Sequence, residues 1–187
     1  IPQLYIKNEF TSSPNLLAIL KTKRLHIIPL TALQLDLYAR SDNSLIENLG
    51  LSNSSVNIPQ PVQEVIRLKT IPAVINPLND PLFSTFWTII DRASNCMVGD
   101  LCFKGNPNEL GEVEIGYGTH SEYQKKGFMT EAVGGLVRWA LNHEKVNCIW
   151  AETDPKNRAS QKVLTKNNFE QIDATPDNIY WRIQNNS

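Results

Sequence analysis

The sequence has few cysteines, almost no net charge and no long hydrophobic run, and each absence excludes a class of protein. The 187 residues include 18 basic and 19 acidic ones, for a formal net charge of -1, so the basic excess typical of nucleic-acid binders and of proteins held on anionic membranes is missing. No hydrophobic run approaches the roughly 20 residues of a transmembrane helix, and no secretory signal is visible at the start. We therefore expect a cytoplasmic protein that binds neither nucleic acid nor membrane.

Cysteine usage points the same way. Cys96, Cys102 and Cys148 are odd in number, form no CxxC pair and stand in apolar surroundings, which is typical of buried, reduced thiols. They do not cluster with histidines, so we expect no metal site. The length suits one domain with a well-covered core. We expect that domain over residues 22–187, after an N-terminal arm or leading strand over residues 1–21.

The order of predicted elements indicates an α/β fold with a mixed, mostly antiparallel sheet flanked by helices. Thr31 and Gln34 form a capping box that opens a helix with Leu33 and Leu37 on one face. The prolines between 59 and 81 favour loops and short helices. We predict strands over residues 24–30, 86–91, 96–105, 111–118 and 146–153, a closing hairpin over 169–172 and 179–183, and further helices over 43–49, 61–71, 128–142 and 157–168.

The helix over 128–142 connects two of these strands as a β–α–β crossover, which implies that the two strands are parallel. Gly134 and Gly135 each cost roughly 1 kcal/mol relative to Ala inside a helix, which close packing of the helix on the sheet explains. The helix begins just past the carboxyl end of a strand, where open α/β sheets bind ligands.

The start of this helix, residues 122–132, reads EYQKKGFMTEA and is a candidate anion site. A helix N-terminus carries unpaired N–H groups and a partial positive charge, and Gly127 lets successive N–H groups face one ligand. Lys125 and Lys126 add positive field, and Thr130 offers a hydroxyl donor. A helix entry with solvated lysines is the alternative that this stretch alone leaves open.

Two runs, EIGYGTHSEYQKKGFMTEAV and WAETDPKNRASQKVLTKNNFE, resemble the Gcn5-related N-acetyltransferase (GNAT) family. Together with the element order over residues 22–183, they look most like its RimJ/RimL-like branch of ribosomal-protein alanine acetyltransferases. Gln124, Gly127 and Thr130 fit the family's turn, whereas Met129 stands where the family often has Gly or Ala. The resemblance implies a GNAT-like domain with splayed central strands and an acetyl-CoA core over about residues 86–170.

The resemblance also implies which residues bind acetyl-CoA, the cosubstrate. The strand over 111–118 hydrogen-bonds the pantetheine arm, and N–H groups near Ile115 polarise the thioester carbonyl. Asn157 and Ser160 lie near the same arm, although Asn157 is also a plausible N-cap. The full predicted set is Ile115, Gly116, Tyr117, Gln124, Lys125, Lys126, Gly127, Phe128, Met129, Thr130, Asn157 and Ser160.

Glu114 is the predicted general base, because a substrate ammonium must lose a proton before it attacks. Strand alternation places it with Glu112 and Gly116 on one face, opposite Val113, Ile115 and Tyr117. Glu112 and His120 are the alternatives.

Many family members protonate the leaving thiolate with a tyrosine, and Leu164 stands at the matching position. Water, Tyr117 or Tyr123 then replaces it, or the thiolate leaves unaided. Asn168 stands in place of the family's usual Gly, and Asn is the next-best residue for a left-handed C-cap.

We expect acetyl transfer by direct attack of a primary amine. The branch resemblance suggests a protein N-terminus as acceptor, with a small-molecule amine as the rival. Residues 40–82 are expected to line the acceptor groove, and their few acidic residues argue against a strongly cationic acceptor.

A non-catalytic acyl-CoA-binding module of the same fold is the second hypothesis. A different nucleotide-binding domain is disfavoured, because the glycines follow neither GxGxxG nor GxxxxGK[ST]. The oligomeric state stays open between monomer and homodimer.

Overall fold

The fold is built on one eight-stranded sheet in the order β1-β2-β3-β4-β5-β6-β8-β7. It comes from a computed structural model that describes residues 19–52 and 56–184, so most of the predicted N-terminal arm lies outside the described residues. The strands are β1 (Leu20–Lys21), β2 (Leu25–Pro29), β3 (Phe86–Asp91), β4 (Cys96–Phe103), β5 (Glu112–Thr119), β6 (Cys148–Thr153), β7 (Glu170–Ala174) and β8 (Ile179–Gln184). Within the described ranges β5 and β6 are the one parallel pair, which confirms the mixed, mostly antiparallel sheet.

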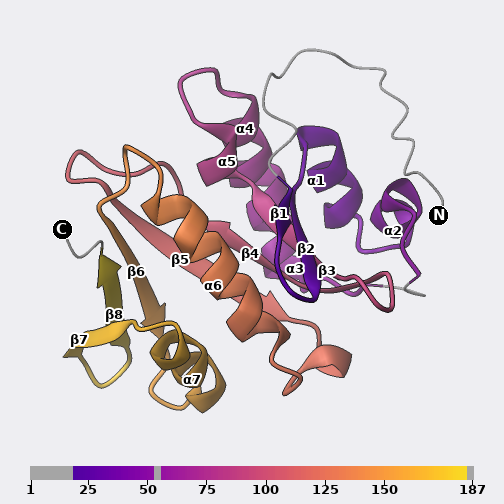
Figure 1. Cartoon of the computed structure of the whole chain (residues 1–187). Helices are drawn as coiled ribbons and strands as arrows, with labels where there is room; N and C mark the ends of the chain where they lie inside the picture. The colour runs from indigo at the N-terminus through magenta and orange to yellow at the C-terminus, as the bar shows by residue number, and fades with distance from the viewer. Residues whose placement is uncertain (1–18, 53–55, 185–187) are drawn as a thin grey trace.

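Helices cover both faces of this sheet (Figure 1). The core on one face contains side chains of α6 and α7, and the core on the other contains side chains of α1, α2 and the π-helical turn η1. The helical elements are α1 (Ala32–Ala39), α2 (Ser44–Leu49), α3 (Gln60–Val65), η1 (Ile66–Thr70), α4 (Ile71–Ile75), α5 (Pro81–Ser84), the 3₁₀ turn η2 (Ser121–Tyr123), α6 (Phe128–Leu141) and α7 (Arg158–Lys166). The helix predicted over 61–71 thus extends from residue 60 to residue 75, and the proline-rich region forms short helices as expected.

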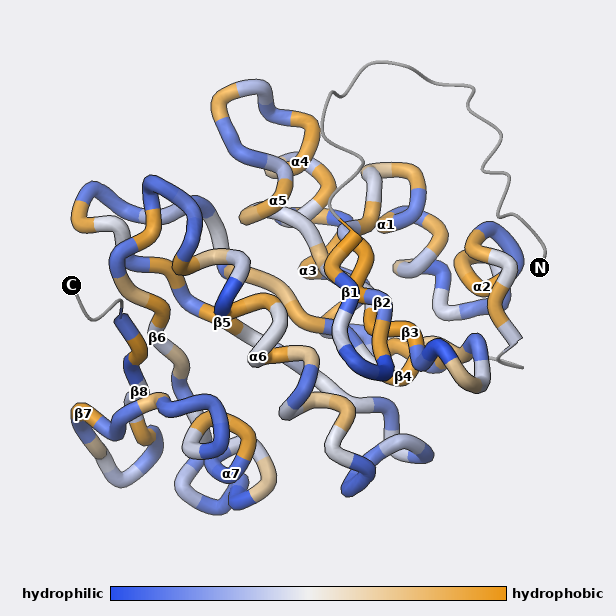
Figure 2. The backbone as a smooth tube through the Cα atoms, in the orientation of Figure 1, coloured by the Kyte–Doolittle hydropathy of each residue, from blue (hydrophilic) through white to orange (hydrophobic). Residues whose placement is uncertain are grey.

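Hydrophobic residues concentrate in the central strands and hydrophilic ones in the loops between them (Figure 2). The core under α6 and α7 includes Leu101, Val113 and Ile115. The core under α1 includes Phe86 and Met97. Since Val113 and Ile115 are buried on the α6 side, the predicted alternation along β5 is confirmed.

The N-terminus of α1 has the predicted capping box. The Thr31 hydroxyl accepts from the Gln34 N–H at 3.2 Å, and the Gln34 side chain accepts from the Thr31 N–H at 3.0 Å. The predicted face is only partly right: Leu37 packs against the core, but Leu33 is 60% exposed, and Leu35 and Tyr38 are buried instead. The sheet lies under the side of α1 that carries residues 35, 38 and 39.

The two glycines of α6 allow two different close approaches. A Cβ on Gly135 would lie 3.0 Å from Thr22 Cγ2 and 3.2 Å from Ile27 Cδ1, so this glycine packs on the sheet as expected. A Cβ on Gly134 would lie 2.6 Å from Oδ1 of Asn167, just past α7. The expectation for Gly134 is therefore corrected: it makes room for the neighbouring helix end, where Asn168 has the predicted left-handed conformation (φ 62°).

Replacing Thr31 with Ala removes the hydroxyl that accepts from the Gln34 N–H, while the Thr31 backbone N–H can still donate to the Gln34 side chain. We expect the free energy of unfolding to fall by about 1 kcal/mol, because the first turn of α1 then loses its side-chain acceptor. Chemical denaturation measures the change. Asn43 is the matched control, since it occupies the N-cap of α2 without a side-chain cap bond; an equal loss for Asn43→Ala would contradict the assignment.

Candidate active site

The centre of the site is the point at which β5 and β6 separate. Their parallel pairing covers three positions, Glu112 with Cys148, Val113 with Ile149 and Glu114 with Trp150. Both strands then continue, β5 to Thr119 and β6 to Thr153. The predicted splaying is therefore present, and it opens a slot whose closed end lies at Glu114.

The backbone of β5 presents free polar groups to this slot. The N–H of Lys104 donates to the C=O of Glu114 at 2.9 Å, so the peptide groups of Glu114 face β4, and alternation turns those of Ile115 and Tyr117 toward β6. Beyond the last β5–β6 pair, the C=O of Ile115 and the N–H of Tyr117 have no strand partner in the described sheet. Such groups require a ligand or water.

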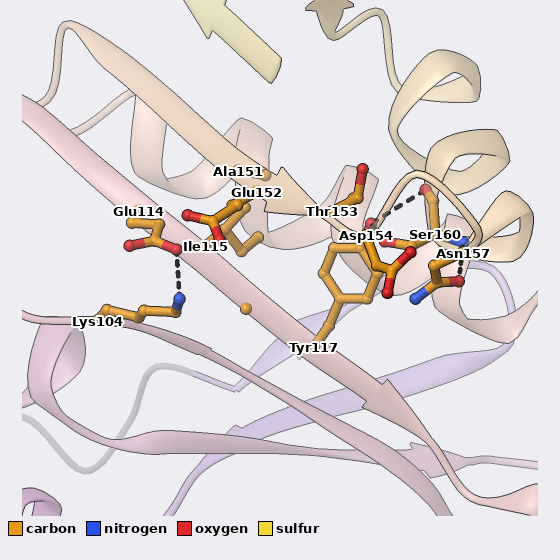
Figure 3. A pocket seen from close by; sticks show the side chains of 11 residues that line it. Lys104, Glu114, Ile115, Tyr117, Ala151, Glu152, Thr153, Asp154, Asn157 and Ser160 are labelled. Atoms are coloured by element: carbon orange, nitrogen blue, oxygen red, sulfur yellow. Dashed lines mark hydrogen bonds and ion pairs between the residues drawn. The ribbon is translucent and has the colours of Figure 1, made fainter. Parts of the chain in front are cut away.

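A cavity of about 200 Å³ occupies the slot. Figure 3 shows Lys104 and Glu114 at one end and Tyr117, Ser160 and Asn157 at the other. The full lining is Lys104, Glu114, Ile115, Gly116, Tyr117, Ala151, Glu152, Thr153, Asp154, Asn157 and Ser160. The cavity thus brings together six predicted site residues from β5 and α7.

Glu114 forms an ion pair with Lys104 at the closed end of the slot. The side chain of Glu114 is 14% exposed and that of Lys104 is 56% exposed. We did not predict Lys104 from the sequence. It follows the last residue of β4, and only the pairing of β4 with β5 places it opposite Glu114.

Asn157 caps α7 and still has a free donor. Its Oδ1 accepts from the Ser160 N–H at 3.0 Å, so the capping role considered from the sequence is confirmed. The amide nitrogen has no hydrogen bond among the described residues, and Asn157 lines the cavity. Asn157 can therefore cap the helix and donate to a ligand at the same time.

One tyrosine, Tyr117, lines the cavity. Its hydroxyl lies 2.8 Å from Ser160 Oγ. Burial raises the pKa of Tyr117 to about 12, and the hydrogen bond with Ser160 opposes the shift only in part. Leu164 is fully buried in the core and Tyr123 does not line the cavity. Of the two tyrosines considered as replacements at the thiolate, Tyr117 alone lies in the slot.

The turn before α6 has two residues in the left-handed region, Lys125 (φ 60°) and Gly127 (φ 78°). A lysine in this conformation is uncommon and marks a constrained turn. No side chain of the described chain caps the helix, so the first N–H groups of α6 remain available. Phe128 and Met129 are buried in the core, so the Met129 side chain points away from the turn and its N–H can still face a ligand.

The remaining predicted residues of the turn lie outside the cavity lining. Gln124, Lys125 and Lys126 are exposed, and the Lys126 ammonium lies 5.2 Å from the Tyr123 ring centroid. The carbonyl of Thr130 accepts from Asn167 at 3.1 Å. The turn and the cavity are thus two parts of the candidate site, joined along β5 and its following loop.

Arg24, which precedes β2, contacts the turn before α6, and we did not predict this from the sequence. It donates to Glu131 at 2.7 Å and to the Lys126 carbonyl at 3.1 Å, and its guanidinium lies 4.7 Å from the Phe128 ring centroid. Partial burial alone raises the pKa of Glu131, but the hydrogen bonds from Thr22 and Arg24 outweigh it and lower that pKa. This cluster fixes the loop between β1 and β2 against the start of α6 and adds a third cation beside the turn.

A second polar cluster lies on the Glu114 side of the sheet. The Tyr38 hydroxyl donates to Asp100 at 2.7 Å, and His120 Nε2 lies 3.9 Å from the same carboxylate. Burial raises the pKa of Asp100 to about 6, against a weaker opposing hydrogen bond from Tyr38, and burial lowers the pKa of His120. His120, an alternative proton carrier, belongs to this cluster and does not line the cavity.

All three cysteines lie within the described residues. Cys96, Cys102 and Cys148 are all free, as expected, but only Cys148 is buried and the other two are half-buried. In residues 19–52 and 56–184, no three His, Cys, Asp or Glu side chains are grouped as metal ligands. Over the same ranges, no helix is long and hydrophobic enough to cross a membrane.

A slot between diverging parallel strands, next to a helix start without a side-chain cap, is the geometry that the resemblance to the GNAT family implies. Residues 24–170 match the family model described as Acetyltransferase (GNAT) domain. The chain belongs to the GNAT family and is an acetyl-CoA-dependent acetyltransferase.

Among its relatives, the chain is 31% identical over 153 residues to the uncharacterized N-acetyltransferase YjdG of Bacillus subtilis (strain 168), a match covering 82% of this chain and 90% of that protein. Its fold is similar to that of RimL, a ribosomal L7/L12 α-N-protein acetyltransferase in complex with coenzyme A (TM-score 0.66, 17% identity, 89% and 97% of the two chains). It is also similar to ribosomal-protein-S5-alanine acetyltransferase from Vibrio fischeri (TM-score 0.63, 17% identity, 90% and 97%). The structural similarity shows that this chain shares the fold of these ribosomal-protein acetyltransferases.

Asp100 predicts a pH dependence of stability. Its pKa is about 6 in the folded chain and near 3.8 without the fold, so from pH 4 to 6 the folded state keeps a proton that the unfolded state has released. Stability therefore falls with rising pH by up to about 3 kcal/mol from this group.

Asp100→Asn removes the titration and keeps an acceptor for Tyr38. The free energy of unfolding of the variant relative to wild type should rise between pH 4 and 6, measured by denaturation at each pH. Parallel curves for the two proteins would contradict the assignment.

Proposed function

We propose that the protein transfers the acetyl group of acetyl-CoA by direct attack to a primary amine at a protein N-terminus. The observation that carries this proposal is the position of Glu114 at the closed end of the slot, where the slot's free peptide groups begin. The pantetheine arm runs along the slot toward Glu114, and the pyrophosphate lies on the start of α6.

The pantetheine arm binds as an added strand between β5 and β6. The C=O of Ile115 and the N–H of Tyr117 face the slot, and the absence of a side chain at Gly116 keeps the strand accessible to the arm. The free amide nitrogen of Asn157 donates to a carbonyl of the arm, and Ser160 borders it. N–H groups of β5 near Ile115 polarise the thioester carbonyl.

The pyrophosphate binds at the turn of residues 124–130. The N–H groups of Gly127, Phe128, Met129 and Thr130 open α6, and the helix dipole favours an anion there. Lys125 and Lys126, with Arg24 beside them, supply positive charge. The side-chain amide nitrogen of Gln124 donates at 3.5 Å to the carbonyl of Thr119, the last residue of β5.

Glu114 removes a proton from the acceptor ammonium, so that the neutral amine attacks the thioester carbonyl. The Tyr117 hydroxyl, neutral because its pKa is about 12, donates toward the leaving thiolate in the role that Leu164 leaves open. No metal takes part in these steps.

The acceptor approaches over the Glu114 face of the sheet. This face continues through Gly116 to Gly118, where a Cβ would meet no atom within 4 Å, so the strand leaves room for a chain above it. The cavity lining has three carboxylates, Glu114, Glu152 and Asp154, against one lysine, which suits an ammonium. RimL and the S5-alanine enzyme, whose substrates are ribosomal proteins, support a protein N-terminus.

Residues 40–82, the predicted acceptor-lining segment, contribute helices to the core on this face, but none of them lines the cavity itself. Their contact with the acceptor stays a prediction.

A panel that includes short peptides with free N-termini and small-molecule amines distinguishes the two acceptor classes. Turnover of small amines alone would contradict the protein acceptor.

Acetyl-CoA binding is tested by thermal unfolding, with NADH and ATP as controls. At a ligand concentration near 100 times Kd, about 2.7 kcal/mol of stabilisation raises Tm by roughly 5 to 10 °C in a domain of this size.

Asn157→Asp is the matched variant, because aspartate preserves the cap of α7 and removes the amide donor. We expect its Tm without ligand to be retained and its Kd for acetyl-CoA to rise about tenfold. Equal affinity would place Asn157 outside the site.

The base is tested with Glu114→Gln on an acceptor found in the panel. We expect kcat to fall by about 10²-fold or more, because glutamine cannot take the proton, while Kd for acetyl-CoA stays within about twofold. Thiol release measures the rate. Glu112→Gln tests the alternative base, and wild-type activity in Glu114→Gln with normal cofactor binding would support a different base or a non-catalytic module.

A further inference from the structure

We propose that Lys104 is an acetyl acceptor within the protein, so that the enzyme acetylates its own Lys104 when no other amine occupies the site. This inference rests on the proposed function, because it takes the acetyl group from acetyl-CoA bound in the slot. It assigns a modification site to a residue that the transfer mechanism does not use.

Lys104 combines the two properties that an acceptor amine needs. Its ammonium is ion-paired with Glu114, the proposed base, and its side chain lines the same cavity as Ile115 and Tyr117, whose peptide groups face the proposed acyl arm. The Lys104 ammonium thus occupies the position in which an external substrate ammonium must stand to give its proton to Glu114.

The backbone holds Lys104 in this place. Its N–H donates to the C=O of Glu114 at 2.9 Å, which fixes the two residues opposite each other across β4 and β5. Its Cε lies 3.7 Å from the position that a Cβ on Gly116 would take, so the side chain extends along the strand surface toward the slot. Because 56% of the side chain is exposed, the amine can move from the carboxylate to the thioester without leaving a buried charge.

No other lysine of the described chain shares this arrangement. Lys104 is the one lysine among the cavity-lining residues, and the one described lysine that pairs with a carboxylate. Lys125 and Lys126 belong to the turn that binds the pyrophosphate, at the opposite end of the acyl arm. Modification by this mechanism is therefore specific to Lys104.

The chemistry is the proposed transfer with an internal amine. Glu114 takes one proton from the Lys104 ammonium, and the nitrogen lone pair attacks the thioester carbonyl carbon. The C–N bond forms and the C–S bond breaks, the thiolate takes the second nitrogen proton and leaves as free coenzyme A, and Glu114 returns its proton to solvent. The products are N-acetyl-lysine, coenzyme A and one proton, and no oxidant or reductant is required.

The experiment incubates the full chain with acetyl-CoA carrying a ¹³C-labelled acetyl group and follows each lysine by peptide mass spectrometry. We expect label on Lys104 at least about tenfold faster than on Lys166, an exposed lysine of α7 outside the cavity, because Lys104 is held at the reacting group. Glu114→Gln should slow Lys104 labelling by about 10²-fold and leave Lys166 unchanged. At saturating acetyl-CoA, the first-order rate should be unchanged on dilution of the protein.

Two variants separate the site from general reactivity. Lys104→Arg keeps the charge next to Glu114 but offers no acceptor amine, so the fast phase should disappear. Lys166→Arg should leave Lys104 labelling as in wild type. Folding of each variant is checked by its denaturation curve, and because Lys104→Arg preserves the ion pair, its result remains informative if Glu114→Gln is unstable.

The outcomes distinguish this inference from the proposed function. A thermal shift with acetyl-CoA but equal labelling of Lys104 and Lys166 would overturn self-acetylation and leave acetyl-CoA binding intact. Fast labelling of Lys104 in both wild type and Glu114→Gln would overturn transfer assisted by Glu114. If the thermal shift is also absent, the proposed function fails and this inference fails with it.

Discussion

The structure depends on one interrupted pairing, the loss of hydrogen bonds between β5 and β6 beyond Glu114 and Trp150. Buried peptide groups need partners, and in the proposed function the pantetheine arm is that partner. The separation also makes room for α7, whose first residues line the far side of the slot. Glu114 is the last paired residue of β5, so the same feature opens the slot and places the proposed base at its closed end.

The two faces of the sheet have different tasks. On one, α6 and α7 pack against Val113 and Ile115, and their N-termini belong to the proposed cofactor site. On the other, the row of Glu114, Gly116 and Gly118 faces the proposed acceptor. Strand alternation alone produces this division, since successive side chains of β5 point to opposite faces. The Arg24–Glu131 pair stabilises the arrangement by fixing α6 against the loop before β2.

Local patterns made much of the fold and part of the site predictable. The capping box of α1 and the left-handed Asn168 involve residues three to five apart, so the sequence contains the whole interaction. Alternation along β5 likewise predicted which residues are buried. The predicted face of α1 was only partly right, because which leucine is buried depends on how the helix rests on the sheet. Gly134 was misassigned for the same reason, since its neighbour Asn167 belongs to another helix.

By itself, the sequence determined the element order, the mixed sheet and the turn at Gly127, because propensity, period and capping act over a few residues. The tertiary structure alone decided that Lys104 pairs with Glu114, that Arg24 lies beside the turn, and that the amide nitrogen of Asn157, an N-cap already expected from the sequence, stays free. The register of β4 and β5 places Lys104 opposite Glu114, and packing brings Arg24 from the loop before β2 to the start of α6. Neither of these two contacts can be predicted from a short stretch of residues.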